Sequence, residues 1–325
     1  MNWDILSRRI LEGGALERKE ALKVLESDDN ELLAVLDAAF AIRRYYFGRD
    51  VSLHVIRNAK SGSCSENCSF CSQSAISESD IPRYPILSVE ELLDGARKAH
   101  GMRAKRYCIV TSGRGPSSKE LDQICNAARK IKDEIPVQIC TSLGLLTEEQ
   151  AIQLKAAGVD RYNHNLESSE RFFPSFCTSH AYSDRVATAR IAKAAGMELC
   201  SGGLVGMGEG LEDRVDLAFV LRGLEADSIP VNFLNPCPGT PMEGFRKLTP
   251  RDCLRILAMF RLVNPEKEIR VAGGRESCIG HMQVLSLYAA DSMFTTGYLT
   301  TAGQGYEADI AMINQAGFKI TEYID

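Results

Sequence analysis

The amino-acid sequence predicts a (β/α)8 barrel of the TIM type with an N-terminal helical extension. Short apolar runs alternate with helical patterns eight times between about residue 52 and the C-terminus. Such alternation is typical of a parallel sheet, and eight strands is the number at which a parallel sheet closes on itself. A chain of 325 residues is long enough for one barrel domain of this kind. A doubly wound open sheet is the alternative architecture for the same pattern.

Residues 1–48 are predicted to form the helical extension. Apolar residues recur there at helical spacing, first within residues 16–25 and then within residues 32–36. The segment is charged along its whole length and lacks the apolar core of a secretory signal, so we expect a cytoplasmic protein. No repeat or Pro/Ser-rich linker follows, so residues 49–325 are predicted to form one barrel domain.

The predicted strands are short apolar runs, and most are followed by a helix-start signal. Ser88 and Glu91 form a capping-box pattern, and Ser117, Thr147 and Thr249 open later helical patterns with the same chemistry. In such a barrel, residues needed for chemistry lie at the carboxyl ends of the strands. The predicted strands are residues 51–56, 106–111, 137–141, 161–164, 198–201, 230–233, 268–272 and 292–295.

The composition argues against several classes of function. Hydrophobic residues make up 45% and charged residues 25% of the chain, and the net charge is −5. No long Lys/Arg run is present, so we expect neither nucleic acid nor a membrane as a partner. No apolar stretch approaches the roughly 18 residues that span a bilayer. In a large chain without a secretory signal, the 11 cysteines indicate reduced thiols, metal ligands or catalysis rather than disulfides.

Three thiols lie within eight residues after the first predicted strand, at Cys64, Cys68 and Cys71. Thiolates are soft ligands that suit iron–sulfur clusters and zinc. A structural zinc site would need a fourth Cys or His at similar spacing, but the nearest histidine, His54, lies within the strand. We therefore expect an iron–sulfur cluster with one iron left without a protein ligand.

This C-x3-C-x2-C motif, with Phe70 just before the last cysteine, resembles the signature of the radical S-adenosylmethionine superfamily. The resemblance implies a [4Fe–4S] cluster on the three cysteines, whose fourth iron chelates S-adenosylmethionine. It also implies that one electron cleaves the bound cofactor to methionine and a 5′-deoxyadenosyl radical.

A second set of chemistry-bearing residues falls on other predicted strands. Cys108, Cys140 and Cys200 lie on the second, third and fifth strands, and Arg270 lies on the seventh. A single strand cysteine is usually a small buried hydrophobe. Strands of one barrel can nevertheless bring three thiols and a guanidinium together, and a buried Arg needs a negative partner. A thiolate-ligated cluster would supply that negative charge.

From about residue 10 to the C-terminus, the sequence resembles the biotin synthase family, whose members are radical sulfurtransferases. The resemblance implies that sulfur is inserted between C6 and C9 of dethiobiotin to form biotin. It implies a second, sacrificial cluster, usually [2Fe–2S], on Cys108, Cys140, Cys200 and Arg270. It further implies a flavodoxin or ferredoxin as electron donor, and a homodimer. The segments that carry the resemblance are residues 138–144, 162–167, 199–209, 232–241, 268–276 and 298–303.

The same resemblance implies contacts to substrate and cofactor. Asn163, Asn165 and Asn232 match positions that contact dethiobiotin or the cofactor, and their amides suit a ureido ring. The alternative is that these amides cap loops at strand ends. Glu167 stands where the family often has Asp, and its carboxylate is expected to accept hydrogen bonds from ribose hydroxyls. Arg185 matches an arginine that pairs with the cofactor carboxylate, and its alternative is an exposed arginine in a first helical turn.

A glycine-rich segment matches the part of the superfamily that admits the adenine ring. It comprises Gly202, Leu204 and Gly206, and it ends at Glu209. The small residues leave room for the edge of the ring.

The remaining cysteines depart from the family pattern. Cys237 and Cys278 follow the sixth and seventh predicted strands. They are either free loop cysteines or added ligands that would make the second cluster larger than [2Fe–2S]. Cys125 and Cys253 lie in helical patterns and are expected to be packing residues. The sequence assigns no role to Cys177.

Two other functions compete with this interpretation. The first is another radical enzyme on the same barrel, such as a hydrogenase-cluster maturase or a carbon-skeleton mutase. The second is a non-enzymatic iron–sulfur scaffold or carrier.

Overall fold

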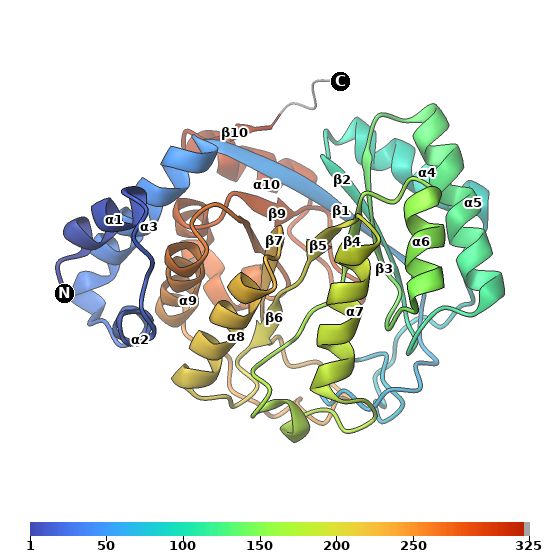
Figure 1. Cartoon of the computed structure of the whole chain (residues 1–325), viewed down its shortest axis with the longest axis horizontal. Coiled ribbons are helices and arrows are strands. Elements are labelled where there is room, and N and C mark those ends of the chain that lie inside the picture. The colour runs from blue at the N-terminus through green and yellow to red at the C-terminus, as the bar shows by residue number, and fades with distance from the viewer. Residues whose placement is uncertain (322–325) are drawn as a thin grey trace.

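In the computed structural model, which describes residues 1–321, parallel strands close into a barrel surrounded by helices (Figure 1). Around the barrel the strands pair in the order β1–β2–β3–β4–β5–β7–β8–β9, and β9 pairs with β1. This closing pair confirms the predicted barrel and excludes the open sheet. The strands are β1 (Asp50–Lys60), β2 (Arg106–Thr111), β3 (Gln138–Ser142), β4 (Arg161–Asn163), β5 (Glu198–Cys200), β6 (Gly203–Val205), β7 (Ser228–Phe233), β8 (Glu268–Val271), β9 (Ser292–Phe294) and β10 (Lys319–Ile320).

The fifth barrel strand is split into β5 and β6, which pair with β7 one after the other. The break falls at Ser201 and Gly202. A side-chain Cβ atom at Gly202 would lie 1.9 Å from the backbone oxygen of Pro230 on β7. Only glycine fits this close backbone approach. The predicted strand at residues 198–201 is therefore one half of a longer, interrupted strand.

Helices follow most of the strands and begin at the predicted caps. The side chains of Ser88, Ser117, Thr147 and Thr249 each accept a hydrogen bond from a backbone N–H group in the first turn. The helices are α4 (Val89–Gly101), α5 (Ser118–Glu134), α6 (Glu148–Ala156), α7 (Tyr182–Ala194), α8 (Leu211–Gly223), α9 (Pro250–Val263) and α10 (Tyr306–Gln315), and the short segments are η1 (Asp29–Glu31), η2 (Phe173–Ser175), η3 (Arg275–Ile279) and η4 (Gly280–Tyr288).

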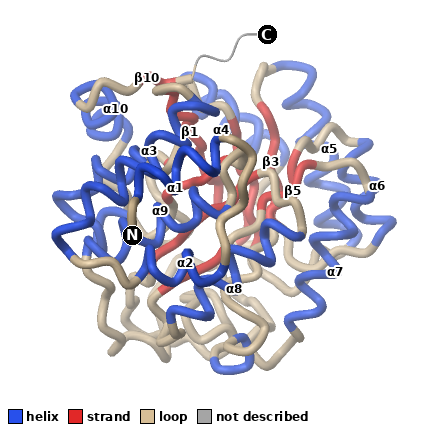
Figure 2. The backbone as a smooth tube through the Cα atoms, turned by 60° about the vertical axis from the view of Figure 1, so that its left-hand side comes forward, coloured by secondary structure: helices blue, strands red, loops and turns tan. Residues whose placement is uncertain are grey.

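Three helices precede the barrel: α1 (Trp3–Leu11), α2 (Arg18–Leu25) and α3 (Leu32–Phe47). They pack beside α8 and α9, and Figure 2 shows them lying together on that side. Arg43 of α3 is fully buried and donates hydrogen bonds to the backbone oxygens of Gly48, Asp50 and Ala290. These bonds fasten α3 to the barrel. The division of the chain at residue 48 stays a prediction.

An ionic layer fills the barrel interior near the amino ends of the strands. Glu268 Oε2 accepts a hydrogen bond from Arg106 Nη1 at 2.9 Å, and Glu268 Oε1 lies 3.2 Å from Arg161 Nη1. His54 on β1 is fully buried and lies 3.4 Å from the same carboxylate. We call Arg106, Arg161, His54 and Glu268 the barrel floor. The floor leaves the opposite end of the barrel open to ligands.

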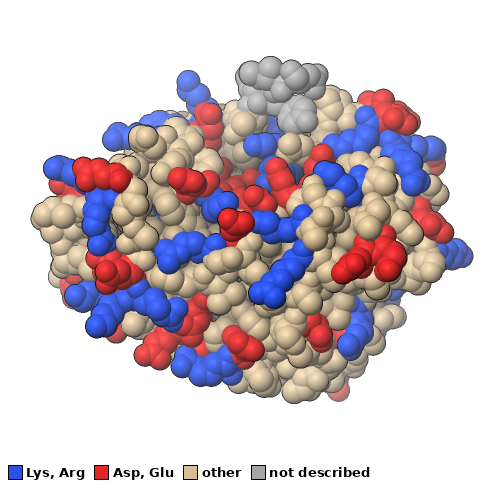
Figure 3. Space-filling view, in the orientation of Figure 1, with Lys and Arg blue, Asp and Glu red and all other residues tan. Residues whose placement is uncertain are grey.

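Charged side chains of both signs are interspersed over the face shown in Figure 3. Mixed charge of this kind gives no extended basic surface on that face. Among residues 1–321, no helix combines the length and the apolar character needed to cross a membrane.

Candidate active site

A cavity of about 390 Å³ opens at the carboxyl ends of the barrel strands. Its walls come from the loops after β1, β2, β3, β4, β8 and β9 and from the strands themselves. The first cysteine set therefore faces the same space as Cys108, Cys140 and Arg270, whereas Cys200 is not part of the lining. The lining includes Cys64, Cys68, Cys71, Cys108, Cys140, Arg270, Phe70, Asn163, Asn165, Glu167, Arg185 and Asn232.

The first three thiols lie on the loop after β1, which is held in tight turns. The backbone N–H of Cys71 donates to the oxygen of Cys68 at 3.1 Å. The loop is tied to the segment after β4, because Ser69 donates two hydrogen bonds to the backbone oxygen of Phe176, and the ring of Phe70 lies 5.7 Å from that of Phe176. The loop is thus positioned by the barrel and not by its own turns alone.

The donor set fits an iron–sulfur cluster with three protein ligands. Burial raises the pKa of the Cys71 thiol to about 11, and a bound cation would offset the desolvation that disfavours its thiolate. His54, the nearest histidine in the sequence, lies in the barrel floor and does not line the cavity.

The second set lies deeper in the barrel. Cys108 and Cys140 are directly opposite each other on β2 and β3, and Cys200 lies on β5. Arg270 Nη1 lies 3.6 Å from the sulfur of Cys200. All four side chains are buried. The structure therefore brings together the four residues expected from the sequence.

Arg270 is held by the floor from below. Its Nη2 donates to Ser228 Oγ at 2.8 Å and to Glu268. Burial opposes the charged form, but Glu268 and the neighbouring cysteines outweigh burial and raise the pKa of Arg270. Among the described residues, its buried Nε has no hydrogen-bond partner. This free donor and the converging thiols fit a bound anionic cluster.

The three asparagines line the cavity, but their side-chain amides differ in how many hydrogen bonds they make within the protein. Asn232 donates to the backbone oxygen of Gly203 at 3.1 Å and accepts from the N–H of Gly273 at 2.9 Å. The loop-capping alternative therefore describes Asn232 well. Within residues 1–321, the side chain of Asn163 makes one hydrogen bond, to Ser142 Oγ at 3.2 Å. Its amide oxygen is left available to a ligand.

Arg185 lies in the first turn of α7 and is only 8% exposed, so the alternative of an exposed arginine is wrong. Its Nη1 donates to the backbone oxygen of Asn165 at 2.7 Å and lies 3.8 Å from Glu167 Oε1. Glu167 adopts a left-handed backbone conformation with φ 68°. Burial raises the pKa of its carboxyl, against the effect of Arg185. Both side chains face the cavity.

The glycine-rich segment builds the fifth strand and does not line the cavity. Gly202 permits the close approach to Pro230, and Leu204 is buried in β6. The backbone N–H of Gly206 donates to Glu209 Oε1 at 2.9 Å. The contact of these residues with adenine stays a prediction.

Cys237 and Cys278 also lie outside the lining of the cavity. The Cys237 thiol donates to the backbone oxygen of Asn235, and the Cys278 thiol donates to that of Leu234, each at 3.3 Å. These contacts suit packed thiols, and ligation by either residue stays a prediction. Cys125 and Cys253 are buried in α5 and α9, as expected for packing residues.

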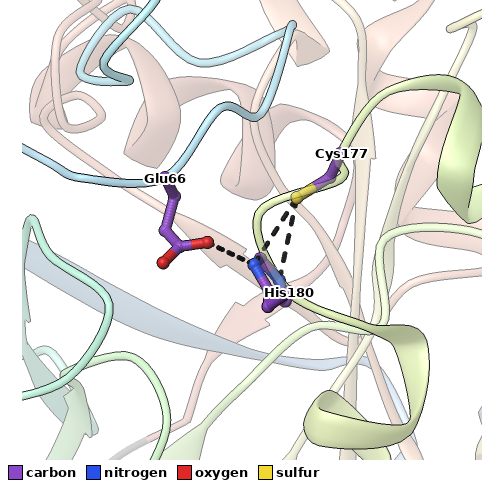
Figure 4. Close-up of side chains that lie close together, drawn as sticks. All are labelled: Glu66, Cys177 and His180. Carbon is purple, nitrogen blue, oxygen red and sulfur yellow. Dashed lines mark hydrogen bonds and ion pairs between the residues drawn. The ribbon is translucent and has the colours of Figure 1, made fainter.

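A cluster that the sequence did not predict adjoins the first cysteine loop (Figure 4). Cys177 Sγ lies 3.7 Å from Cys68 Sγ and 3.5 Å from His180 Nδ1. Glu66 pairs with the same nitrogen of His180. Glu66 lies inside the cysteine motif, and His180 precedes Arg185 by five residues. Glu66 and His180 are 114 residues apart, so no local sequence pattern could predict that they meet.

Two family models together match most of the chain. Residues 60–221 match the radical SAM superfamily, and residues 230–319 match the Biotin and Thiamin Synthesis associated domain.

Curated relatives match over nearly the full length. The biotin synthase of Salinibacter ruber is 53% identical over 317 residues, which cover 98% of this chain and 88% of the relative. That of Halalkalibacterium halodurans is 51% identical over 320 residues, which cover 98% of this chain and 96% of the relative. That of Bacillus subtilis is 49% identical over 318 residues, which cover 98% and 95%.

Solved structures share the fold at low identity. Methylornithine synthase superimposes with a TM-score of 0.87 and 21% identity, covering 98% of each chain. The FeFe-hydrogenase maturase HydG from Carboxydothermus hydrogenoformans superimposes with a TM-score of 0.82 and 18% identity, covering 98% of this chain and 79% of that one. The barrel is thus common to several chemistries, and function must come from the site.

Proposed function

The chain belongs to the biotin synthase family of radical S-adenosylmethionine enzymes, and from this premise we propose which of its residues convert dethiobiotin into biotin. The observation that carries the assignment is that the first cysteine set lines one cavity together with Cys108, Cys140 and Arg270, and that Cys200 lies beside Arg270. A substrate between them would meet a radical source on one side and a sulfur source on the other.

We propose that Cys64, Cys68 and Cys71 hold the [4Fe–4S] cluster. The loop after β1 presents these thiols to the cavity, and Arg185 and Glu167 line the same cavity. Arg185 would pair with the carboxylate of S-adenosylmethionine, and Glu167 would accept hydrogen bonds from its ribose. When bound, the cluster and S-adenosylmethionine supply the radical that abstracts hydrogen from dethiobiotin.

We propose that Cys108, Cys140, Cys200 and Arg270 hold the auxiliary cluster that donates sulfur, of the [2Fe–2S] type usual in the family. The thiols converge from separate strands, and Arg270 keeps its charge in a buried position. A rigid barrel interior holds such a cluster at a fixed depth below the substrate. Asn163, whose amide oxygen accepts no hydrogen bond from the described residues, would bind the ureido ring of dethiobiotin.

Two partners follow from the family. The cleavage of S-adenosylmethionine consumes an electron, so we propose a flavodoxin or ferredoxin as its donor. We also propose a homodimer, which sedimentation of the reconstituted protein would test.

The decisive experiment compares three anaerobically reconstituted proteins: wild type, a triple Ala variant of the first cysteine set, and Cys125→Ala as a packing control. Each receives S-adenosylmethionine, reductant and dethiobiotin, and 5′-deoxyadenosine, biotin and iron per chain are measured. Wild type and the control should form both products. The triple variant should form neither and should retain only the auxiliary iron, identified by its Mössbauer spectrum.

The same experiment separates the competing functions. Formation of 5′-deoxyadenosine without biotin would indicate another radical enzyme on this barrel, and iron without 5′-deoxyadenosine would indicate a scaffold. Normal 5′-deoxyadenosine formation by the triple variant would overturn the assignment of the first cysteine set.

A further inference from the structure

Glu66, His180 and Arg185 form a continuous chain of side-chain hydrogen bonds from the first cysteine loop to the cavity. Glu66 lies inside that loop, is buried, and pairs with His180 Nδ1 (Figure 4). His180 Nε2 accepts a hydrogen bond from Arg185 Nε at 2.9 Å. An arginine can only donate, so Nε2 is the acceptor and Nδ1 carries the proton that it donates to Glu66. The chain therefore fixes one tautomer of His180.

The same hydrogen bonds argue against a metal ion at this cluster. Glu66, Cys177 and His180 offer ligand atoms within 4.8 Å of one another. A metal bound to His180 Nδ1 would displace the proton shared with Glu66 and leave a proton on Nε2. Arg185 already donates to Nε2, so two donors would face each other. The cluster is better suited to holding Arg185 than to holding a metal.

Arg185 is restrained on two of its three nitrogens. Nε is held by His180, and Nη1 is held by the backbone oxygen of Asn165. The guanidinium also lies over the ring of Phe173, with its carbon 5.5 Å from the ring centroid. Among the described residues, Nη2 makes no hydrogen bond, and the side chain lines the cavity. The restraints leave Nη2 available to a carboxylate there.

We propose that Glu66 and His180 are positioning residues that hold the Arg185 guanidinium for the carboxylate of S-adenosylmethionine. The inference rests on the role proposed above for Arg185. A long arginine side chain loses rotamer freedom when it binds a ligand. Here His180 restricts that freedom before the ligand arrives. Because Glu66 belongs to the first cysteine loop, these hydrogen bonds also couple the position of Arg185 to the position of that loop.

The test uses two substitutions of His180 and a matched control. His180→Leu removes both the acceptor and the donor, whereas His180→Gln retains one of each. Asp213→Asn is the control, because Asp213 is a buried carboxylate that fastens the same β4–α7 segment through Ser169 and Arg171 but does not contact Arg185. Each anaerobically reconstituted protein is titrated with S-adenosylmethionine to obtain Kd, and iron per chain, KM and kcat are measured.

His180→Leu should raise both Kd and KM for S-adenosylmethionine roughly tenfold, because the released Arg185 side chain would then lose its rotamer freedom on binding the cofactor. Its kcat at saturation and its iron content should match those of wild type, because the cluster ligands are intact. His180→Gln should recover most of the affinity, and Asp213→Asn should bind like wild type. A general loss of structure would instead affect all three variants together.

Three results would overturn the inference: an unchanged Kd in His180→Leu, an equal rise in Asp213→Asn, or a loss of iron in His180→Leu. Failure of the proposed function has a different signature, in which the wild-type protein binds S-adenosylmethionine but forms no biotin. A wild-type protein that binds no S-adenosylmethionine would overturn both.

Discussion

Glu268→Gln is expected to destabilise the cluster-free protein strongly, because three buried guanidinium groups share the Glu268 carboxylate. It accepts hydrogen bonds from Arg106, Arg161 and Arg270. These arginines are at most 3% exposed. Glutamine preserves the size of the side chain, but it removes the charge and turns an NH2 group toward the arginine donors.

The size of the effect follows from burial. Two unit charges about 4 Å apart interact by about 4 kcal/mol at an effective dielectric constant of about 20. Removing one partner of a buried ion pair costs about 3–5 kcal/mol, and we expect a loss in that range for Glu268→Gln. Glu198 contacts Arg106 and Arg161 as well, but its side chain is 45% exposed. Glu198→Gln should therefore cost about 1 kcal/mol or less, because water screens the pair.

Urea unfolding of both variants at neutral pH, followed by circular dichroism, measures these losses as shifts of the midpoint at constant slope. The reasoning is refuted if Glu268→Gln loses less than about 1 kcal/mol, or if the two variants lose equally. The loss from Glu268→Gln should be smaller in the cluster-loaded protein, because ligated thiolates would supply negative charge near Arg270.

Three further predictions concern individual side chains. Cys200→Ala should retain 5′-deoxyadenosine formation but lose biotin, and normal biotin formation without auxiliary iron would contradict the sulfur-donor assignment. The double variant Cys237→Ser, Cys278→Ser should keep its auxiliary iron and Mössbauer spectrum, since each thiol already donates to a backbone oxygen; lost iron would make them ligands. Burial disfavours the Asp213 carboxylate, but hydrogen bonds, including one from Arg171, outweigh burial and lower its pKa below 3.8. Its stabilising contribution is therefore present above that pH and lost below it. Asp213→Asn should accordingly make the free energy of unfolding depend less on pH between about pH 5 and pH 2. A pH profile equal to that of wild type would contradict this.

Local patterns in the sequence were sufficient to predict the barrel. Alternating strands and helices report burial at each position, and Ser88, Ser117, Thr147 and Thr249 begin helices through contacts within one turn. The grouping of Cys108, Cys140, Cys200 and Arg270 was also predictable, because strands of a closed barrel share one interior. Their ligation of a cluster stays a prediction.

Contacts between distant segments were decided by the tertiary structure alone. The pairing of β9 with β1, the interruption at Gly202 and the charge sharing at Glu268 depend on strand register and close packing. His180 meets Glu66 only because the loops after β1 and β4 run side by side, and Cys278 packs against Leu234 for a similar reason. The sequence by itself determined which residue types and which fold were present, since those depend on neighbours along the chain. Which side chains touch depends on the paths of loops that no local pattern encodes.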